Sequence, residues 1–403
     1  MTTARTATPS TARAINDRLA LDLLLESGPL TATELRVLTG LSRPTVADLL
    51  DRLQRAGLVA VVGESGEQRR GPNARLYALV ADRAHLAGLD VRSTGVSLVV
   101  ADLTGRTRAT ADVPAGDLGT LVTRTVDALA AAAAEAGAAS LHTVAVGAPG
   151  LFDPATGEHH NSGSLPGWHT DLIAALHDGT GADVIADTDV VVDNEVNLAG
   201  IAEHRLGAAR DRDTFVLVWL SHGVGASVVL DGRLRRGATG GTGEIGYLPV
   251  HGADLPESVT GCAGGGFHTL VSSAAVRALA RDHGLPDPVR PGERSSAPPG
   301  EAEVRAAVAA GPAGHAFLDA YARRVALGAA AVCAVLDPGC IVLGGEIGRA
   351  GGPALARRVE QRLADLLPLR TEVRPGTAGG GAVLAGAVLT AGDAARRDLF
   401  GGA

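Results

Sequence analysis

Two stretches of the chain, about 130 residues apart, repeat one pattern of strands and turns. They read LAGLDVRSTGVSLVVADLTGRT and FVLVWLSHGVGASVVLDGRLRRG. Each contains an apolar strand, a turn of small residues, a second apolar strand and an Asp-Gly type of turn before an arginine. Because helix and strand patterns follow each copy, the sequence predicts two α/β lobes that both open with a hairpin. A small ligand is expected in the cleft between such lobes.

Residues 15–80 follow a different pattern, which indicates three helices and a hairpin. Apolar residues at helical spacing predict helices in NDRLALDLLLESG, TATELRVLTG and RPTVADLLDRLQRAG. Either Thr31 or Thr33 can cap the second helix, and Ser42 can cap the third. The segments LVAVVG and ARLYALV predict the hairpin. Helices joined by a tight turn and followed by a hairpin are typical of a winged helix-turn-helix.

The charge of the chain is unevenly distributed. The net charge is −8, which argues against a protein that coats nucleic acid along its whole length. Residues 1–80 nevertheless hold ten arginines against eight acidic residues, a net of +2, which leaves −10 for residues 81–403. The positive balance thus lies in the segment with the helix-turn-helix pattern.

The start of the third predicted helix is the part of this motif that enters the major groove of DNA. Arg43 can reach a guanine edge or a phosphate there, and Thr45 can bond to either. Arg69 and Arg70, in the loop of the hairpin, suit phosphates or a neighbouring minor groove. We therefore predict a surface that binds operator DNA, made of Ser42, Arg43, Pro44, Thr45, Val46, Arg69 and Arg70.

The cysteines and the N-terminal residues bear on the compartment. Cys262, Cys333 and Cys340 are too few and too scattered for a disulfide framework or a four-thiolate zinc site, and they favour a reducing compartment. Residues 1–14 lack the apolar core of a signal peptide, and no window approaches 18 unbroken apolar residues. We expect a cytoplasmic protein that does not contact a membrane, with residues 1–14 as a disordered leader.

Three segments resemble the ROK family (repressors, open reading frames, kinases), specifically its regulators with an N-terminal winged helix: LSRPTVADLLDRLQRAGLV with RRGPN, HGVGASVVLDGRLRRGATGGTGEIGYLPV, and LDPGCIVLGGEIG. The resemblance extends over residues 15–400. It implies an α/β chain, with a winged helix-turn-helix over 15–82 followed by a bilobed actin/hexokinase-like (duplicated ribonuclease H-like) domain. The expected first lobe is 83–195 plus 385–403, and the expected second lobe, with a dimerisation surface, is 196–384.

The kinases of this family phosphorylate sugars from ATP, and their first phosphate loop reads Asp-x-Gly-Gly-Thr or close to it. Such a reaction needs a carboxylate base, glycine-rich backbone at the phosphates and a bound metal. Here the aligned residues 90–94 read DVRST, with both glycines replaced. Because a Cβ crowds the phosphate, we expect Arg92 in particular to obstruct nucleotide binding.

The segment VVVDNEVNLAGIAE resembles the family's catalytic pattern, in which an Asn precedes the base Asp. One pairing matches Asn194 to that Asn and places Glu195 at the base. Glutamate is one methylene longer, and a misplacement of ~1 Å can cost on the order of 100-fold in rate. A pairing shifted by one residue places Asp193 and Asn194 there instead and leaves no carboxylate at the base position. Both pairings predict no phosphoryl transfer, so we expect no catalytic residue and no enzymatic activity.

The zinc motif of the family is also altered. Many members carry Gly-Glu-x-Gly-His followed by a run of cysteines that form a His-plus-three-Cys structural zinc site. This chain has GEIGY and then TGCAGGGFHTL, so that Tyr247 replaces the histidine and only Cys262 remains. One thiolate is too few for a tetrahedral site, and we expect neither a metal nor a cofactor.

Parts of the family's sugar site remain. The resemblance implies a ligand set in which Asn194 and Glu244 are retained, Glu195 is enlarged, Tyr247 is substituted and His268 takes the last place. Carboxylates and amides suit the hydroxyls of a sugar, and a buried polar cluster left empty would be costly. Three alternatives stay open: a sugar or sugar derivative, an unrelated small metabolite, or a cleft that has lost its ligand.

These features together predict a transcriptional regulator, of the repressor type, that binds operator DNA and senses a small-molecule effector. A homodimer or dimer of dimers is expected, from the resemblance and because a two-fold protein matches a palindromic operator. The alternative is an ATP-dependent sugar kinase with a DNA-binding arm.

Overall fold

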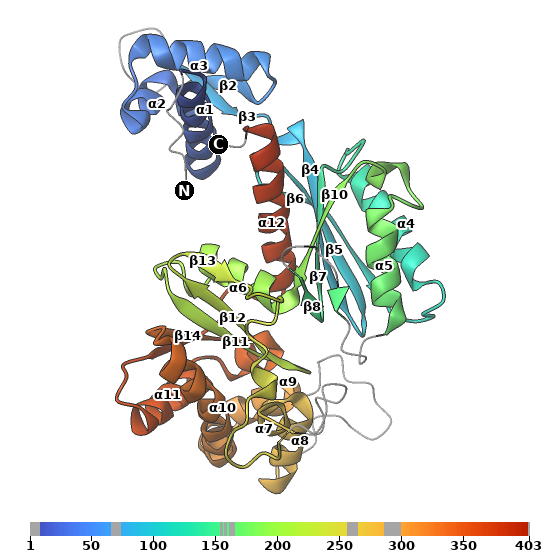
Figure 1. Ribbon diagram of the computed structural model, residues 1–403, viewed down its shortest axis with the longest axis vertical. Helices are drawn as coiled ribbons and strands as arrows, with labels where there is room; N and C mark the ends of the chain where they lie inside the picture. The colour runs from blue at the N-terminus through green and yellow to red at the C-terminus, as the bar shows by residue number, and fades with distance from the viewer. Residues whose placement is uncertain are drawn as a thin grey trace.

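The computed structural model describes residues 9–65, 74–153, 156, 159–160, 166–255, 265–285 and 300–401. Figure 1 shows a small helical unit, the winged helix, next to two larger α/β lobes. None of the helices within these ranges is long and apolar enough to cross a membrane.

The winged helix comprises α1 (Pro9–Ser27), β1 (Leu30–Thr31), α2 (Ala32–Thr39), α3 (Arg43–Arg55), β2 (Val59–Ser65) and β3 (Ala74–Leu79). The strands form a sheet in the order β1-β3-β2, with both pairs antiparallel. Because α1 begins at Pro9, residues 9–14 are helical, and their assignment to a disordered leader is wrong. Proline is favoured in the first turn of a helix, and Ala12 and Ala14 have high helix propensity. Residues 1–8 lie outside the described ranges.

Hydrogen bonds at the helix ends explain why the helices start and stop where they do. Thr31, not Thr33, caps α2: its hydroxyl accepts from the Glu34 amide at 3.2 Å, and its own amide donates to the Glu34 carboxylate at 2.7 Å. Gly40 ends α2 in the left-handed conformation, with φ 70°. Ser42 caps α3 as predicted.

The first lobe is built on a sheet with the strand order β10-β7-β4-β5-β6. Strands β4, β5 and β6 are antiparallel neighbours, whereas β7 and β10 run parallel to β4. The strands are β4 (His85–Arg92), β5 (Gly95–Asp102), β6 (Thr107–Pro114), β7 (Thr143–Ala148) and β10 (Asp189–Asn194); a separate ribbon pairs β8 (Leu151–Phe152) with β9 (His159–His160).

The second lobe repeats this sheet strand by strand, in the order β13-β12-β11-β14-β15. Again three antiparallel strands are followed by two parallel ones. The strands are β11 (Phe215–Leu220), β12 (Val224–Leu230), β13 (Arg233–Arg235), β14 (Cys340–Gly344) and β15 (Glu372–Pro375). The duplicated α/β architecture predicted from the repeat is therefore confirmed.

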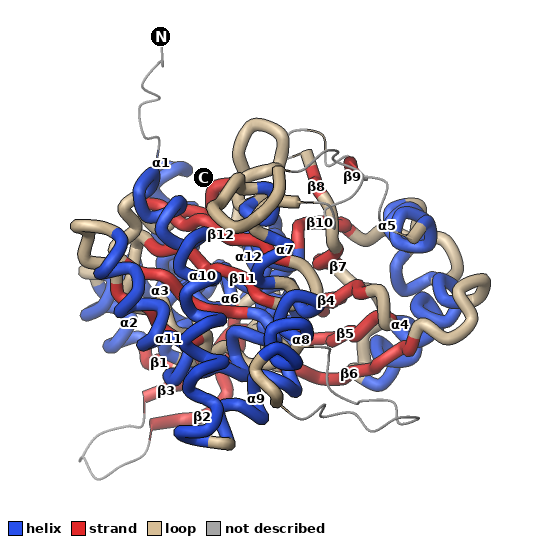
Figure 2. Tube along the Cα trace, turned by 90° about the horizontal axis from the view of Figure 1, so that it is seen from below, coloured by secondary structure: helices blue, strands red, loops and turns tan. Residues whose placement is uncertain are grey.

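Helices cover both sheets (Figure 2), and two of them lie between the lobes (Figure 1). Helix α12 packs on α6 and on strands β4 and β7, and α6 packs on β12. The α-helices of the lobes are α4 (Leu121–Glu135), α5 (Gly167–His177), α6 (Glu195–Arg205), α7 (His268–Val271), α8 (Ser273–Asp282), α9 (Glu301–Ala309), α10 (His315–Leu336), α11 (Gly345–Leu366) and α12 (Ala382–Leu399); short 3-10 turns are η1 (Ala81–Arg83), η2 (Asp183–Ile185), η3 (Ile245–Tyr247) and η5 (Gly311–Gly314).

One apolar cluster connects the winged helix to the lobes. It contains Leu24 and Leu79 of the winged helix, continues through Leu86 at the start of β4, and includes Ala391 of α12 and Phe400 just after it. Figure 1 shows α12 running from between the lobes to the winged helix. The DNA-binding unit and the lobes thus share a hydrophobic core through α12.

Candidate functional site

The start of α3 presents polar groups to solvent. Residues 42–45 are exposed, and the hydroxyls of Ser42 and Thr45 lie 2.8 Å apart. Within the described part of the chain, the Arg43 guanidinium has no hydrogen-bond or ion-pair partner. A long cation that is free at a helix N-terminus, beside two hydroxyls, can reach the phosphates and base edges of DNA.

Val46 does not belong to this surface. Its side chain is only 2% exposed and packs in the core with Leu49, Leu50 and Leu53. The prediction that Val46 contacts DNA is therefore wrong, because this residue also belongs to the apolar stripe that holds α3 in place. Arg69 and Arg70 lie outside the described residues, and their role in the wing stays a prediction.

The side chain of Asn194 has a structural role at the start of α6. Its side-chain oxygen accepts from the Val196 amide at 2.8 Å, which caps the helix, and its amide group donates to the Gly150 carbonyl at 3.0 Å. Asn194 therefore positions the first residue of α6, Glu195, at the end of strand β10.

The two pairings considered for the catalytic segment place different carboxylates at the site. Asp193 is buried and fully engaged: Arg236 donates to one of its oxygens at 3.0 and 2.6 Å, and Asn197 donates to the other at 2.8 Å. Glu195 instead has a buried oxygen, Oε2, without a hydrogen-bond partner among the described residues. The carboxylate available to a ligand is thus Glu195, which favours the first pairing.

The surroundings of Glu195 make its ionised form unfavourable. Burial raises the pKa of Glu195 to about 7, and the negative charges of Asp90 and Glu244 raise it as well. Burial also raises the pKa of Asp90 and that of Glu244. A region with several such carboxylates binds hydroxyl donors well, since each donated hydrogen bond stabilises a charge that water reaches poorly.

The remaining predicted ligand residues come from a second segment of the other lobe. Glu244 directly precedes η3, Tyr247 ends it, and the charge of Glu244 acts on Glu195. His268 begins α7 next to this turn, where a Cβ on Gly246 would lie 3.7 Å from the Cβ of His268. Burial and the neighbouring His222 lower the pKa of His268. The binding roles of these residues stay predictions.

Arg92 lies where the sequence predicts an obstruction. It is the last residue of β4, and it forms ion pairs with Asp90 at 2.8 Å and with Glu346 of the other lobe. Burial opposes ionisation of Glu346, but Arg92 helps to hold the pKa of this carboxyl below its usual value.

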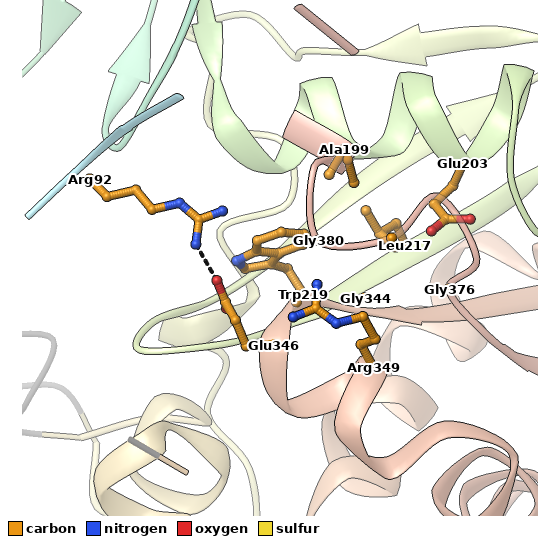
Figure 3. Close-up of a pocket in the computed structure, with 13 residues that line it drawn as sticks. Arg92, Ala199, Glu203, Leu217, Trp219, Gly344, Glu346, Arg349, Gly376 and Gly380 are labelled. Carbon is orange, nitrogen blue, oxygen red and sulfur yellow. Dashed lines mark hydrogen bonds and ion pairs between the residues drawn. The ribbon is translucent and has the colours of Figure 1, made fainter. Parts of the chain in front are cut away.

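Figure 3 shows the pocket beside this ion pair, between the end of β4 and the start of α11. Its free volume is about 20 Å³, room for about one water molecule. The lining residues are Arg92, Ala199, Glu203, Leu217, Trp219, Gly344, Gly345, Glu346, Arg349, Gly376, Gly379, Gly380 and Ala382.

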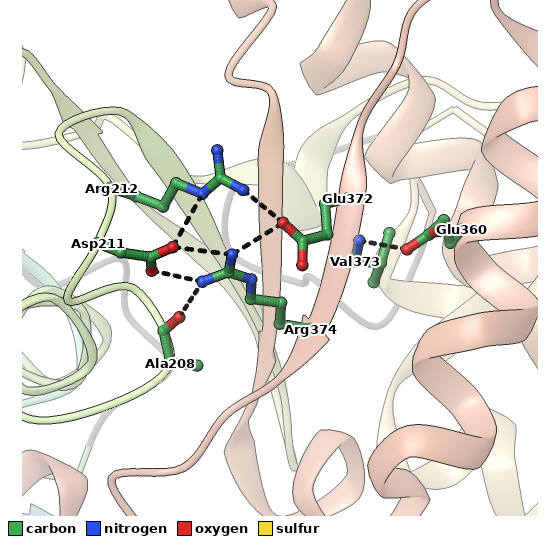
Figure 4. A network of polar contacts seen from close by, with 7 residues as sticks. All are labelled: Ala208, Asp211, Arg212, Glu360, Glu372, Val373 and Arg374. Carbon is green, nitrogen blue, oxygen red and sulfur yellow. Dashed lines mark hydrogen bonds and ion pairs between the residues drawn. The ribbon is translucent and has the colours of Figure 1, made fainter.

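Glu203 of α6 organises the loop at the edge of this pocket. Its buried carboxylate accepts from the amides of Ala208, Thr377 and Ala378 at 2.7, 3.1 and 2.9 Å. The Ala208 carbonyl in turn accepts from Arg374, which also pairs with Asp211 and Glu372 (Figure 4). These contacts join the end of α6 to β15 and to the loop that leads into α12.

Sequence reasoning did not identify Glu346, Arg236 or Glu203 as site residues. Glu346 and Arg236 lie within segments that resemble the family, but their partners are 254 and 43 residues away along the chain. Glu203 ends the segment VVVDNEVNLAGIAE and matches a downstream Glu of the family's pattern, but that match assigned no contact to it. Cys262 lies outside the described residues, so the expectation of no zinc site stays a prediction.

Comparison with known sequences finds two matching families. The chain matches the ROK family over residues 86–394 and the MarR family over residues 15–71. It is 35% identical to the bifunctional enzyme NanE/NanK of Brucella melitensis over 177 residues, which cover 43% of this chain and 29% of that protein. It is 24% identical to the DNA-binding transcriptional dual regulator NagC of Escherichia coli over 277 residues, which cover 66% of this chain and 63% of that protein. It is 22% identical to the xylose repressor of Bacillus subtilis over 250 residues, which cover 59% of this chain and 60% of that protein. The chain thus spans less than two thirds of the length of each of these relatives.

Solved structures share the fold. A ROK family transcriptional regulator, a homolog of the Escherichia coli MLC protein, matches with a TM-score of 0.70 and 22% identity over 97% of this chain and 100% of that chain. The ROK hexokinase of Thermus thermophilus matches with a TM-score of 0.60 and 25% identity over 77% and 99%. The first match includes the winged helix, whereas the second covers a smaller share of this chain.

Proposed function

Because this chain belongs to the ROK family and carries a winged helix of the MarR type, we propose that it is a DNA-binding transcriptional regulator, of the repressor type, that acts in the cytoplasm. The observation that carries the proposal is the exposed start of α3, where Arg43 has no partner among the described residues and the hydroxyls of Ser42 and Thr45 lie close together. The regulators NagC and the xylose repressor among the relatives support the same function.

The effector in this proposal is a sugar or a related metabolite that binds at Glu195. Its buried, unpartnered oxygen and the nearby Glu244 offer acceptors for neighbouring hydroxyl groups. The names of the relatives, which include a xylose repressor and an N-acetylglucosamine repressor, point to the same class of ligand.

We also propose that the two lobes have no kinase activity. Arg92 occupies the position of the family's first phosphate loop and is held there by ion pairs with Asp90 and Glu346. Kinases are present among the relatives, so a direct assay is needed. Incubation of the protein with ATP and a panel of sugars should yield no phosphorylated product. If the protein did phosphorylate a sugar and Glu195→Gln abolished this activity, the proposal that the lobes are not enzymatic would be contradicted.

Effector binding would act on DNA through α12. This helix packs on α6, which begins with Glu195, and shares an apolar cluster with the winged helix. A change in lobe closure would therefore shift the winged helices of a homodimer relative to two operator half-sites. The homodimer is part of the proposal, since a two-fold protein reads a palindrome with two such helices.

DNA fragments selected from a random library by repeated binding provide the test. Arg43→Ala should weaken binding by about ten-fold or more, because a good base contact is worth roughly 1–3 kcal/mol. Replacing Arg69 and Arg70 by Ala should weaken binding to all sequences alike. Arg55→Ala is the matched control, since Arg55 is exposed at the other end of α3 and pairs with Asp51.

All variants are compared by fluorescence anisotropy at one salt concentration. Binding by Arg43→Ala that equals the wild type would exclude this interface. For the effector, thermal shifts across a sugar library should identify a ligand that stabilises the protein by ~2.7 kcal/mol at 100 times its Kd. Absence of any stabilising sugar would contradict the effector class.

A further inference from the structure

Two arginines of the described chain reach from one lobe to a buried carboxylate of the other, in opposite directions; a third pair between the lobes, Arg205 with Asp393, has a more exposed carboxylate. Arg92, at the end of β4 in the first lobe, pairs with Glu346 at the start of α11 in the second. Arg236, directly after β13 in the second lobe, pairs with Asp193 near the end of β10 in the first. In these two pairs, each lobe provides one arginine and one carboxylate to the other.

Both carboxylates are deeply buried, whereas the arginines are partly exposed. Glu346 and Asp193 are 6% and 4% exposed, and the side chains of Arg92 and Arg236 are 35% and 39% exposed. A buried carboxylate that loses its partner is strongly unfavourable, because water reaches it poorly. Separation of the lobes would take both guanidinium groups away at once, so the two pairs favour the closed arrangement.

The two pairs lie close to Glu195. Asp193 is two residues before Glu195 along the chain, and the charge of Arg92 acts on Glu195. The pocket between Arg92 and α11 has a free volume of about 20 Å³. The closure of the lobes around Glu195 is therefore supported by side chains of the protein itself.

We propose that Arg92 and Arg236 are positioning residues that hold the lobes closed around Glu195 through reciprocal ion pairs, without the help of a bound nucleotide. The proposal concerns the cleft of the proposed function and rests on that function only for the consequence at DNA. Effectors would then compete with, or reinforce, a closure that exists before they bind.

Trp219 provides a reporter for this closure. It lines the same pocket as Arg92 and Glu346 (Figure 3), and the chain has one other tryptophan, Trp168. In the full-length protein with Trp168→Phe, acrylamide quenching therefore reports on access to this pocket. The radius of gyration from small-angle X-ray scattering provides an independent measure of lobe separation.

Replacing either arginine by methionine, which keeps the length and removes the charge, should open the lobes. We expect Arg92→Met and Arg236→Met to raise the quenching constant of Trp219 about two-fold and to increase the radius of gyration. Arg92→Lys should restore part of the wild-type value. Arg349→Met is the matched control, because Arg349 lines the same pocket but its carboxylate neighbour, Glu301 at 3.7 Å, belongs to the same lobe.

Far-UV circular dichroism identifies variants that fold. If Arg92→Met does not fold, Glu346→Gln provides the second test, since it keeps a hydrogen-bonding group and removes the charge of the partner. A folded Arg92→Met or Glu346→Gln protein with wild-type quenching and radius would overturn the proposal, as would an equal effect of Arg349→Met. These measurements need neither DNA nor effector, so their failure is distinct from a failure of the Arg43 experiment.

Discussion

The winged helix and the junction between α6 and α12 are stabilised by contacts of different range. In the winged helix, caps join residues three apart, such as Thr31 with Glu34 and Ser42 with Thr45. At the junction, Glu203 binds amides that are 174 and 175 residues away along the chain. The winged helix thus depends on many small interactions between neighbouring residues. The junction between α6 and α12 depends on a few contacts, each of which holds distant segments of the chain together.

The largest effect is expected where α6 and α12 approach most closely. A Cβ on Gly386 of α12 would collide with the carbonyl oxygen of Leu198 in α6, which is backbone and has no freedom to move aside. Gly386→Ala should therefore prevent folding or cost more than about 4 kcal/mol of unfolding free energy. Urea denaturation measures this effect.

Gly392→Ala on the same helix is the control. There a Cβ would lie 2.8 Å from the end of the Arg396 side chain, which is flexible. The control should be neutral or slightly stabilising, since alanine favours a helix over glycine by about 1 kcal/mol. Equal losses for both substitutions would refute the close junction.

The next effect concerns the buried carboxylate of Glu203. Glu203→Ala leaves three amides without an acceptor, and hydrogen bonds to a charged group are worth roughly 1.5–3 kcal/mol each, so we expect a loss near the lower end of their sum, about 4.5 kcal/mol. Glu360→Ala provides the contrast, because the exposed Glu360 accepts from one amide, that of Val373, at 2.8 Å. A Glu203→Ala protein as stable as Glu360→Ala would show that the loop before α12 does not depend on Glu203.

Glu195, at the start of α6, should make stability depend on pH. Its pKa of about 7 in the folded protein exceeds the ordinary value of 4.5, so the folded state binds more protons between these values. Stability should therefore fall as pH rises from 4.5 through 7, and Glu195→Gln should remove this loss, with a gain of roughly 3 kcal/mol at pH 8. Melting temperatures at pH 5 and pH 8 test this; a gain of the same size at both would contradict the assignment.

The smallest effect belongs to the winged helix. Thr31→Ala removes the cap of α2 and should cost about 1 kcal/mol of unfolding free energy. Thr33→Ala, at an exposed position in the same helical turn, should change little. If the two substitutions cost the same, the capping box is not what defines the start of α2.

The same difference in range explains what could be predicted from the sequence. Caps, turns and periodic apolar residues are local, so Ser42 and the hairpin could be predicted from neighbouring residues, and the two lobes could be predicted because such a local pattern occurs twice. The sequence allows two environments for Val46. Its place on the apolar stripe of α3 indicates the core, whereas its place near the helix start indicates the DNA-binding surface, and the structure shows that the side chain is buried in the core. The start of α1 was missed, since residues 9–14 lack apolar periodicity although they favour a helix.

The ion pairs of the cleft could not be predicted, because nothing in the pattern around Arg92 or Arg236 indicates which distant carboxylate each one meets. The resemblance to the family identified the carboxylate segments, but it left Asp193 and Glu195 as alternatives. Only the three-dimensional arrangement shows that Asp193 is satisfied by Arg236 and Asn197 whereas Glu195 is not.

The apolar cluster that includes Leu79, Leu86, Ala391 and Phe400 has a consequence for protein engineering. A chimera that joins this winged helix to the lobes of another regulator would place the C-terminal end of a foreign α12 against Leu24 and Leu79. Such a chimera should be stable only when the last turn of that helix and the residue after it are exchanged together with the N-terminal segment. The unit to transplant therefore consists of two pieces from opposite ends of the described chain.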